Sequence, residues 1–369
     1  MKSVLVTGAN GFIGKNLIVH LNEHEHFKVL SFTRHNSIDE LQGLVDQADT
    51  VVHLAGENRP QNLSAFEIVN SGLTQLLCDA IRSSKRIIPL LFASSMQAEQ
   101  NNPYGKSKLI AEQSVELLAN QTGNPVYIYR LPNVFGKWCK PNYNSVVATF
   151  CFNIANNIPI QINDPLTPLR LVYIDDVISD FLNVIQKTSH GISRPTIKPE
   201  YSTTLGEIAE QIYAFKDCRS SLISELVGGG LVRALYSTYM SYLNPEKFSY
   251  SLTQNIDDRG VFVEMLKTKN SGQFSYFTAH PGITRGGHYH HSKSEKFLVI
   301  LGEARFRFRN IATDESYEIF ISGEQPKVVD TVPGWSHDIT NVGKEKLVVM
   351  LWANEIFDRN NPDTIPAKV

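Results

Sequence analysis

The 369-residue sequence has few cysteines, a balanced charge and no long apolar segment, and each of these absences narrows its function. The cysteines lack CxxC spacing, which argues against a disulfide framework or a cysteine-rich metal site. We therefore expect reduced thiols, as in a cytoplasmic protein. With 35 basic and 37 acidic side chains, the net charge of −2 gives no reason to expect a nucleic-acid partner. The cysteines are Cys78, Cys139, Cys151 and Cys218.

A membrane role is disfavoured in the same way. The longest apolar stretch, residues 87–93, is interrupted by Pro89 and is much shorter than the about 20 residues that span a bilayer. No basic region followed by an apolar region opens the chain, so we expect no signal peptide. The sequence therefore predicts a cytoplasmic protein with no membrane partner.

The first half of the sequence shows a regular alternation of apolar and amphipathic segments. Up to about residue 190, short apolar runs alternate with amphipathic stretches, which predicts a Rossmann-type α/β fold: a doubly wound parallel sheet with helices on both faces. A helical region follows over residues 200–243, with a start signal at Thr203–Glu207 and a break at Gly228–Gly230. The expected strands are residues 3–6, 28–32, 50–54, 87–93 and 126–129.

The pattern changes after Asn244 and Pro245. Short alternating runs separated by Gly, Pro, Asn and Asp predict an all-β domain from about residue 250 onward. Since the length already predicts two domains, we place the first at residues 1–243 and the second at residues 250–369. The expected strands of the second domain include residues 273–279, 296–300, 304–309, 317–322 and 346–352.

A glycine-rich loop, Gly8-x-x-Gly11-x-x-Gly14, follows the first expected strand and opens a helix. Its small residues let the backbone approach a pyrophosphate, and the helix N-terminus attracts the negative charge. This context predicts a nicotinamide dinucleotide site. The residues that we expect to contact the cofactor here are Gly8, Asn10, Gly11, Phe12, Ile13 and Gly14.

The choice between the two nicotinamide cofactors depends on the end of the second expected strand. Thr33-Arg34-His35 stands where an acidic residue would bind a ribose 2′-hydroxyl. Arg34 suits a 2′-phosphate, so the sequence favours NADPH over NADH. The alternative is that Arg34 is a solvated surface side chain.

A Tyr-x-x-x-Lys pair predicts the chemistry. Tyr104 and Lys108 share one face of a helix that starts after Pro103, and an adjacent ammonium is expected to favour the ionised form of the tyrosine. Ser94 and Ser95 end the strand just upstream, where a hydroxyl can hold a substrate oxygen beside the tyrosine. Spacing alone does not decide between these two serines. The pair of Tyr104 and Lys108 could also be an ordinary amphipathic surface.

With the glycine loop, this region resembles the extended short-chain dehydrogenase/reductase family over roughly residues 1–243. The resemblance implies Ser95, Tyr104 and Lys108 as catalytic residues, with Tyr104 and Lys108 also contacting the cofactor. Residues 130–136 and 171–177 are similar to the nucleotide-sugar members of that family. The similarity implies that Asn133 lies near cofactor or substrate, and that Asp175 and Asp176 are structural.

The second domain carries a set of metal-ligand residues. His288 and His290 lie on one face of an expected strand, Glu295 follows after a turn, and His337 lies on a later strand. Three neutral imidazoles and one carboxylate suit a catalytic divalent ion, with zinc the first choice and manganese, iron and nickel behind it. Core histidines or a purely structural metal are the alternatives. We interpret His291 as a neighbouring or substrate-facing imidazole.

These residues are spaced as in the cupin family, which the chain resembles over residues 250–369 and which implies a small jelly-roll barrel. One departure is that Pro333 directly precedes Gly334, whereas the family has one residue between them. The departure leaves His337 in register with Asn341.

The fusion of the two parts resembles the CapF/WbjC group of bacterial capsule and O-antigen enzymes, notably in residues 102–105, 135–145 and 255–260. The resemblance implies a homodimer acting on a UDP-2-acetamido-2,6-dideoxy-hexos-4-ulose, a UDP-linked 4-keto-6-deoxy amino sugar, on the route to UDP-N-acetyl-L-fucosamine. The cupin would epimerise C3, and the reductase domain would reduce the C4 ketone with NADPH. One alternative is a single-activity reductase with a structural or sugar-binding cupin. Another is an NADPH-sensing regulator, which the intact catalytic set argues against.

Overall fold

The computed structural model describes residues 1–369 except positions 61, 188, 189, 249, 292, 312 and 361. The chain forms two compact units. The first consists of Met1–Ile212 with Arg233–Leu243, and the second of Tyr213–Val232 with Asn244–Val369. Residues 213–232 thus group with the second unit, although the sequence pattern placed them in the first domain. Strand β10 (Ile223–Ser224) accounts for this, because it pairs with β12 (Gly260–Thr268) of the second unit.

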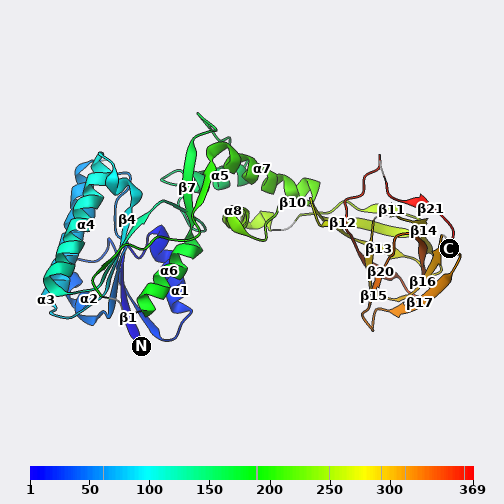
Figure 1. Ribbon diagram of the computed structural model, residues 1–369, viewed down its shortest axis with the longest axis horizontal. Helices are drawn as coiled ribbons and strands as arrows, with labels where there is room; N and C mark the ends of the chain where they lie inside the picture. The colour runs from blue at the N-terminus through cyan, green and yellow to red at the C-terminus, as the bar shows by residue number, and fades with distance from the viewer. Residues whose placement is uncertain (61, 188–189, 249, 292, 312, 361) are drawn as a thin grey trace. The chain divides into compact units, whose positions relative to one another are not determined.

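The first unit is built around a six-stranded sheet whose strands all pair in parallel (Figure 1). The strand order is β2-β1-β3-β4-β5-β8, so the direction of winding reverses beside β1. The predicted doubly wound α/β fold is confirmed. The strands are β1 (Lys2–Thr7), β2 (Phe27–Phe32), β3 (Thr50–His53), β4 (Leu90–Ser95), β5 (Val126–Leu131) and β8 (Ile192–Ser193).

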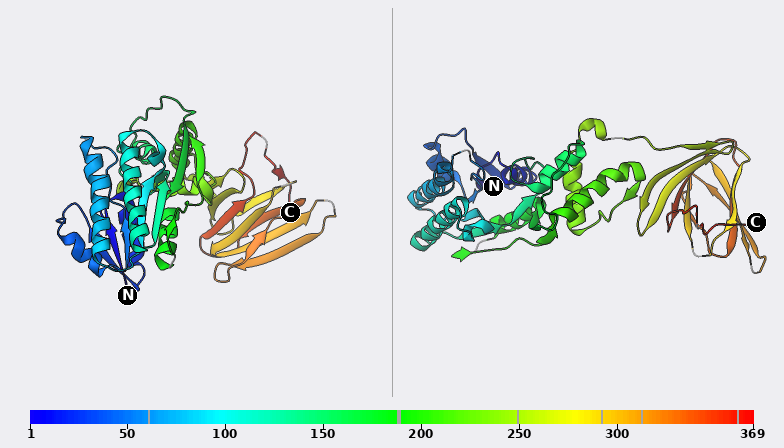
Figure 2. Two further views of the ribbon diagram at one scale, coloured as in Figure 1. Left: turned by 60° about the vertical axis from the view of Figure 1, so that its left-hand side comes forward. Right: turned by 90° about the horizontal axis from the view of Figure 1, so that it is seen from above.

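Helices cover both faces of this sheet, as the two views of Figure 2 also show. On one face α1 (Phe12–Asn22) packs against α6 (Ile174–Gln186). On the other, α3 (Leu73–Ser83) contacts both α2 (Glu40–Gln47) and α4 (Pro103–Thr122). Because both faces are covered, the central strands are almost continuously apolar.

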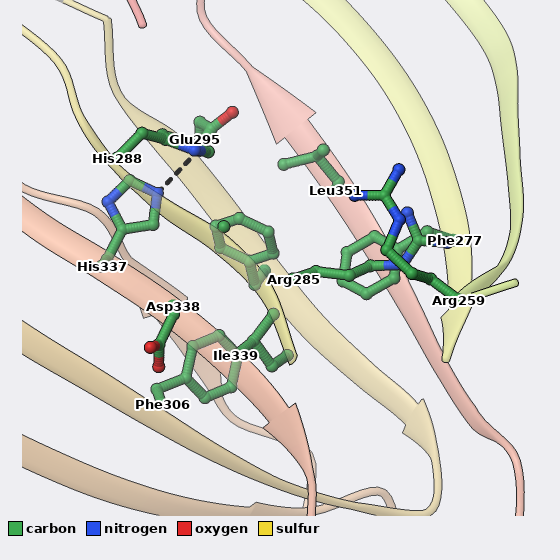
Figure 3. A pocket seen from close by; sticks show the side chains of 12 residues that line it. Arg259, Phe277, Arg285, His288, Glu295, Phe306, His337, Asp338, Ile339 and Leu351 are labelled. Atoms are coloured by element: carbon green, nitrogen blue, oxygen red, sulfur yellow. Dashed lines mark ion pairs between the residues drawn. The ribbon is translucent and has the colours of Figure 1, made fainter. Parts of the chain in front are cut away.

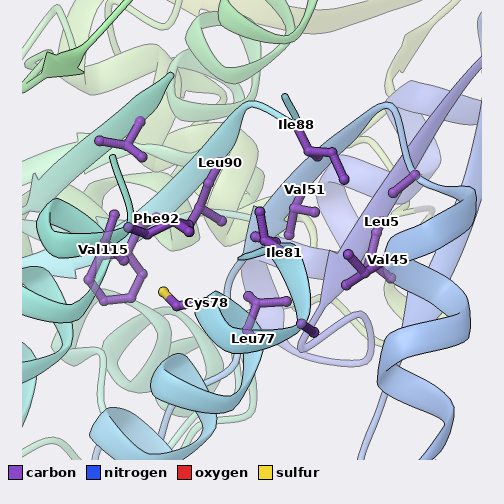
Figure 4. Packing of buried hydrophobic residues seen from close by; sticks show 14 of the residues in the cluster. Leu5, Val45, Val51, Leu77, Cys78, Ile81, Ile88, Leu90, Phe92 and Val115 are labelled. Carbon is purple, nitrogen blue, oxygen red and sulfur yellow. The ribbon is translucent and has the colours of Figure 1, made fainter. Parts of the chain in front are cut away.

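Figure 4 shows the core between the sheet and helices α2, α3 and α4. Leu5, Val51 and Phe92 of the strands meet Leu77 of α3 and Val115 of α4, all fully buried. The strand expected at residues 87–93 begins only at Leu90. Proline at position 89 has no N–H to donate to a ladder, which explains the later start.

A small sheet and three helices complete this part of the chain. Glu207 accepts hydrogen bonds from Thr204 N (2.9 Å) and Thr203 Oγ1 (2.8 Å), which caps α7 at the predicted start signal. The small sheet has the order β6-β7-β9. Its strands are β6 (Asn133–Phe135), β7 (Pro168–Tyr173) and β9 (Tyr201–Thr204), and the helices are α5 (Val146–Ala155), α7 (Leu205–Ser221) and α8 (Gly230–Met240).

The second unit is a sandwich of two mainly antiparallel sheets, so the predicted all-β domain is confirmed. One sheet has the order β10-β12-β13-β20-β15-β18 with β11 beside β12, and the other has the order β17-β16-β19-β14-β21. Their inner faces share one apolar core, in which Phe297 and Phe306 pack with ring centroids 5.8 Å apart. The remaining bounds are β11 (Asn255–Asp257), β13 (Gly272–Ala279), β14 (Thr284–Tyr289), β15 (Glu295–Leu301), β16 (Glu303–Asn310), β17 (Ser316–Ser322), β18 (Val328–Asp330), β19 (Trp335–Asn341), β20 (Leu347–Ala353) and β21 (Ile365–Pro366).

Among the helices of the described residues, none is both long and apolar enough to cross a membrane.

Candidate functional site

The glycine-rich loop lies at the carboxyl end of β1, where the winding of the sheet reverses. This is where open α/β sheets bind dinucleotides. Gly8 has a φ of 68°, and a Cβ there would lie 2.7 Å from the backbone nitrogen of Ala55. Gly11 donates its N–H to Gly8 O (2.8 Å) and caps α1, whose first turn carries no acidic side chain. The amino end of α1, at Phe12 and Ile13, therefore offers backbone N–H groups and positive potential to a pyrophosphate, and Gly14 packs against the carbonyl oxygen of Gly8.

Arg34 follows β2 and is strongly exposed, with 83% of its side chain accessible. Its Nη2 lies 3.0 Å from Glu57 Oε2, and Tyr143 donates its hydroxyl to the other oxygen of that carboxylate at 2.7 Å. An exposed ion pair stabilises little. A phosphate could therefore replace Glu57 as the partner of Arg34 at small cost.

The start of α4 positions the predicted catalytic pair, Tyr104 and Lys108. Asn102 caps this helix by accepting a hydrogen bond from Gly105 N (2.7 Å), and Pro103 occupies the first turn. Tyr104 and Lys108 consequently lie one helical turn apart on one face. The side chain of Ser95, the last residue of β4, lies close enough to the hydroxyl of Tyr104 to lower its pKa.

The two serines at the end of β4 have different environments. Ser94 is buried and donates to Glu112, whose carboxylate is also held by Arg130 at 2.7 Å. Ser94 is therefore engaged in a structural network. The structure brings Ser95, not Ser94, to Tyr104.

Burial dominates the electrostatics of this pair. It raises the pKa of Tyr104 above its ordinary value, and the hydrogen bond from Ser95 opposes that shift only in part. Burial also lowers the pKa of Lys108 to about 8, while Glu112 opposes the shift. The expectation that a neighbouring ammonium would lower the pKa of Tyr104 was wrong for the protein alone, because it left burial out of account. A tyrosine that stays protonated is suited to donate a proton.

Two further polar residues join the segments around the predicted catalytic residues and were missed in the sequence. Asn70 donates to Ser107 Oγ (2.9 Å) and accepts from Glu57 N (2.7 Å), which ties the segment after β3 to α4. His53 bridges Thr7 Oγ1 (2.6 Å) and Thr74 Oγ1 (2.8 Å), and complete burial lowers its pKa to about 3. In the sequence, His53 was marked only by being a polar residue at the end of the apolar strand β3.

Asn133 lies exposed on β6, and its amide donates to Arg170 O of β7 at 3.3 Å. The structure thus shows it joining two strands, and its contact with cofactor or substrate stays a prediction. Asp175 pairs with Lys137 at the start of α6, in keeping with a structural role.

A second cluster lies between the two sheets of the carboxyl-terminal unit. One ligand atom from each of His288, His290, Glu295 and His337 falls within 4.8 Å of the others. His288 of β14 and His337 of β19 are direct cross-strand partners, with ring centroids 4.7 Å apart. Figure 3 shows His288 and Glu295 close together, with a dashed line from Glu295 to His337.

The donor set of this cluster fits a divalent ion. Burial, followed by the neighbouring His337, lowers the pKa of His288 to about 4, so its imidazole is neutral at physiological pH. Burial on its own would raise the pKa of Glu295, but the hydrogen bond from His290, the close approach of His337 and the charge of Lys293 hold it far below its usual range. The buried Nε2 of His337 lies 3.4 Å from Glu295 Oε2 and makes no hydrogen bond with any of the residues that the structure describes. A neutral imidazole at His288, a buried carboxylate and an unsatisfied nitrogen suit such an ion.

The C-terminal segment forms hydrogen bonds with His290 of this cluster and with the turn that follows it. The carbonyl of Asp363 is hydrogen-bonded to Nδ1 of His290, and its carboxylate accepts from the backbone N–H groups of His291 (2.9 Å) and Lys293 (2.8 Å). His291 itself is exposed, with its ring against Tyr289, and does not join the four ligands. Such outer contacts fix the orientation of metal-binding imidazoles.

Replacing Asp363 with alanine should therefore weaken metal binding, raising the dissociation constant by about 10- to 100-fold. In this variant the N–H groups of His291 and Lys293 lose the two carboxylate oxygens that accept their hydrogen bonds, although the backbone carbonyl of residue 363 still faces His290. Competition with a chromophoric chelator measures the effect. Asp358→Ala, at an exposed carboxylate of the same segment, is the matched control. Equal metal affinity of both variants would show that the segment does not position the ligands.

Two family models match the chain. The NAD dependent epimerase/dehydratase family matches residues 4–197, which is more than half of the chain. The polysaccharide biosynthesis C-terminal domain matches residues 255–365. The two matched regions correspond to the two sites just described.

Two known proteins are similar over nearly the whole length, and a third is similar over part of it. A UDP-2-acetamido-2,6-beta-L-arabino-hexul-4-ose reductase from Pseudomonas aeruginosa is 58% identical over 99% of this chain and 98% of its own. The crystal structure of the capsular polysaccharide assembling protein CapF from Staphylococcus aureus superposes with a TM-score of 0.91 and 43% identity, over 99% of this chain and 100% of that protein. A Bacillus cereus UDP-glucuronic acid 4-epimerase, solved with NAD, shares the fold at 18% identity and a TM-score of 0.56, over 65% of this chain and 98% of its own. The chain therefore belongs to the NAD dependent epimerase/dehydratase family, as a CapF-type member that carries a polysaccharide biosynthesis C-terminal domain.

Proposed function

We propose that the chain is a nucleotide-sugar 4-ketoreductase that acts on a UDP-2-acetamido-2,6-dideoxy-hexos-4-ulose and uses NADPH. The observation that carries this proposal is the placement of Tyr104, which lies beside Ser95 and one helical turn from Lys108. The activity named for the Pseudomonas aeruginosa relative supports a UDP-linked keto sugar as the substrate.

In this proposal the chain's own residues handle the ketone oxygen. NADPH would supply the hydride that reaches C4. Ser95 and Tyr104 bind the oxygen, and Tyr104 donates its proton as negative charge develops there. Burial keeps Tyr104 protonated beforehand, and the ammonium of Lys108 stabilises the tyrosinate that remains.

We further propose that the C-terminal unit epimerises C3 of the same ketone, with one divalent ion held by His288, His290, Glu295 and His337. Zinc is our first choice for this set of three nitrogens and one oxygen. The bound ion would supply Lewis-acid polarisation of the C4 carbonyl, which makes the hydrogen at C3 acidic. The buried cluster at the wall of a cavity supports this role. The final product would be UDP-N-acetyl-L-fucosamine, for capsule or O-antigen.

The chemistry sets the order of the two reactions. The C3 hydrogen is acidic only while C4 is a ketone. Once Tyr104 has protonated the oxygen and C4 is an alcohol, no carbonyl remains to polarise. Epimerisation must therefore precede reduction.

A single-activity reductase whose C-terminal unit only binds sugar or supports the fold is the alternative. The name of the Pseudomonas aeruginosa relative, which describes a reductase alone, favours it. A proton NMR time course in deuterated water separates the two functions. Loss of the C3 proton signal without NADPH is expected for the bifunctional enzyme, and NADPH should then convert the ketone to the alcohol. Reduction with no exchange at C3 would leave the single-activity reductase.

The cofactor preference should depend on Arg34. Arg34→Ala should raise the KM for NADPH by roughly 10- to 100-fold, because a charge-assisted contact to the 2′-phosphate is lost. The KM for NADH, which lacks that phosphate, should change little. Arg86→Ala, at another exposed arginine paired with a carboxylate, serves as the control. Equal effects of Arg34→Ala on both cofactors would refute this assignment.

A further inference from the structure

The strand that carries His288 is bulged just before it. The pairing of β14 with β19 shifts register between Gly286 and His288. Gly286 and Gly287 have φ values of 96° and 79°, and a Cβ on Gly286 would lie 2.8 Å from the carbonyl oxygen of His337. In a regular strand residues 285 and 288 would face opposite sides of the sheet. The extra residue of the bulge reverses this alternation, so Arg285 and His288 line the same cavity.

Arg285 is fixed in place but incompletely satisfied. Its Nε donates to Thr278 O at 3.1 Å, and its guanidinium lies over the ring of Phe277, 5.2 Å from the centroid. Only 13% of the side chain is exposed. Its Nη2 is buried and makes no hydrogen bond within the described chain; Asp257 Oδ1 lies 3.9 Å away. A buried cationic donor without an acceptor is costly unless a ligand supplies one.

Arg259 lines the same cavity, and more than half of its side chain is exposed. It donates through Nε (3.1 Å) and Nη2 (2.6 Å) to Asp257 Oδ2. One carboxylate thus serves two guanidinium groups. The two carboxylates in the cavity lining, Glu295 and Asp338, have cationic partners of their own in Lys293 and Arg307. Figure 3 shows Arg259 and Arg285 side by side, away from His288, Glu295 and His337.

The dimensions of the cavity limit what it can enclose. Its volume of about 160 Å³ lies below the roughly 300–1,000 Å³ of typical small-molecule sites, so we place only the sugar ring of the nucleotide sugar inside it. In the proposed epimerisation, C3 and C4 of that ring lie at the metal ligands. The anomeric carbon C1 is across the ring from C4, and C1 carries the diphosphate. The diphosphate must therefore leave the cavity on the side away from the metal ligands.

We propose that Arg285 and Arg259 form the diphosphate subsite of this cavity. The planar guanidinium forks match phosphate oxygens, and Arg285 is already oriented by Phe277 and Thr278. Arg259 exchanges its exposed contact with Asp257 for a phosphate oxygen as the substrate enters. The subsite rests on the proposed epimerisation, because that reaction places the ketone end of the sugar at the metal ligands.

Chemical footprinting tests the subsite without turnover. The full-length, metal-loaded enzyme is treated with phenylglyoxal, which modifies arginine, and the modified peptides are quantified by mass spectrometry. UDP should remove most of the reactivity of Arg259, whereas uridine, which has no phosphate, should not. Arg305 of the same unit lies outside the cavity lining and should react equally with and without UDP.

Kinetics of deuterium incorporation at C3, measured without NADPH, provide the second readout. Arg285→Met keeps an unbranched apolar stem against Phe277 but removes the guanidinium and its charge, and should raise the KM for the UDP-4-keto sugar roughly 10- to 100-fold. Arg285→Lys should recover part of this loss. Metal content, measured in each variant, checks that the domain is folded. Arg259→Gln should act in the same direction at a more exposed position, where folding is not at risk.

The outcomes separate the subsite from the function on which it rests. Two results would overturn the subsite even if the wild type exchanges deuterium. One is that UDP does not protect Arg259 from phenylglyoxal. The other is that the KM is unchanged in the metal-loaded Arg259→Gln and Arg285→Met enzymes. Protection of Arg259 in an enzyme that exchanges no deuterium would support the subsite as a nucleotide-binding site and overturn the epimerisation.

Discussion

Replacing Tyr104 with phenylalanine should abolish reduction, lowering kcat by about 10²- to 10⁴-fold while NADPH binding stays nearly intact. Only the hydroxyl is lost, and with it the proton that the ketone oxygen must receive. Ser95 and Lys108 remain, but we expect neither to replace Tyr104 as the proton donor. The ammonium of Lys108, whose pKa is about 8, is buried and already donates a hydrogen bond to Ala93 O at 3.0 Å. Stopped-flow oxidation of NADPH and a fluorescence titration of the cofactor measure the two quantities.

The same variant should reveal the order of the reactions. Since reduction is blocked after epimerisation, Tyr104→Phe should accumulate the C3-inverted ketone and incorporate deuterium at C3. Tyr213→Phe, at a half-exposed tyrosine of α7, is the matched control and should turn over normally. Wild-type turnover of Tyr104→Phe would exclude this residue as the proton donor.

The amino-terminal site was largely predictable because its signals are local. The strands of a parallel sheet are buried on both faces, so they read as apolar runs in the sequence. The glycine loop directly follows β1, and Tyr104 and Lys108 share a helix. Both features can therefore be found without knowing which distant segments pair in the folded chain. The direction of the pKa shift of Tyr104 was missed because burial depends on Phe66 and other residues far away in the chain.

The carboxyl-terminal site was predictable only in part. The period of a strand places His288 and His290 on one face, but the approach of His337 depends on the register of β14 against β19. The same register contains the bulge at Gly286, which turns Arg285 toward the cavity. Asp363 is more than seventy residues from His290, and only the folded chain brings its carbonyl to that imidazole. Non-local hydrogen bonds of this kind leave no pattern in the sequence.

Replacing His290 with alanine should remove the metal and stop epimerisation without stopping reduction. His290 is almost completely buried, its Nδ1 is held by Asp363, and its Nε2 faces Glu295 at 3.2 Å. Without this imidazole three ligands remain, and the buried carboxylate loses a hydrogen-bonding partner. We expect elemental analysis to fall from about one ion per chain to a small fraction of that value. Deuterium incorporation at C3 should disappear with the metal.

His291→Ala is the matched control, because this histidine is adjacent in sequence yet exposed and outside the ligand cluster. It should retain both metal and exchange. A C3-inverted 4-keto sugar, supplied to the His290→Ala enzyme with NADPH, should still be reduced, since Ser95, Tyr104 and Lys108 all belong to the first unit. Full metal occupancy in His290→Ala would refute the ligand set. If the metal were lost and deuterium exchange at C3 were unchanged, the ion would not take part in the reaction and its role would be structural.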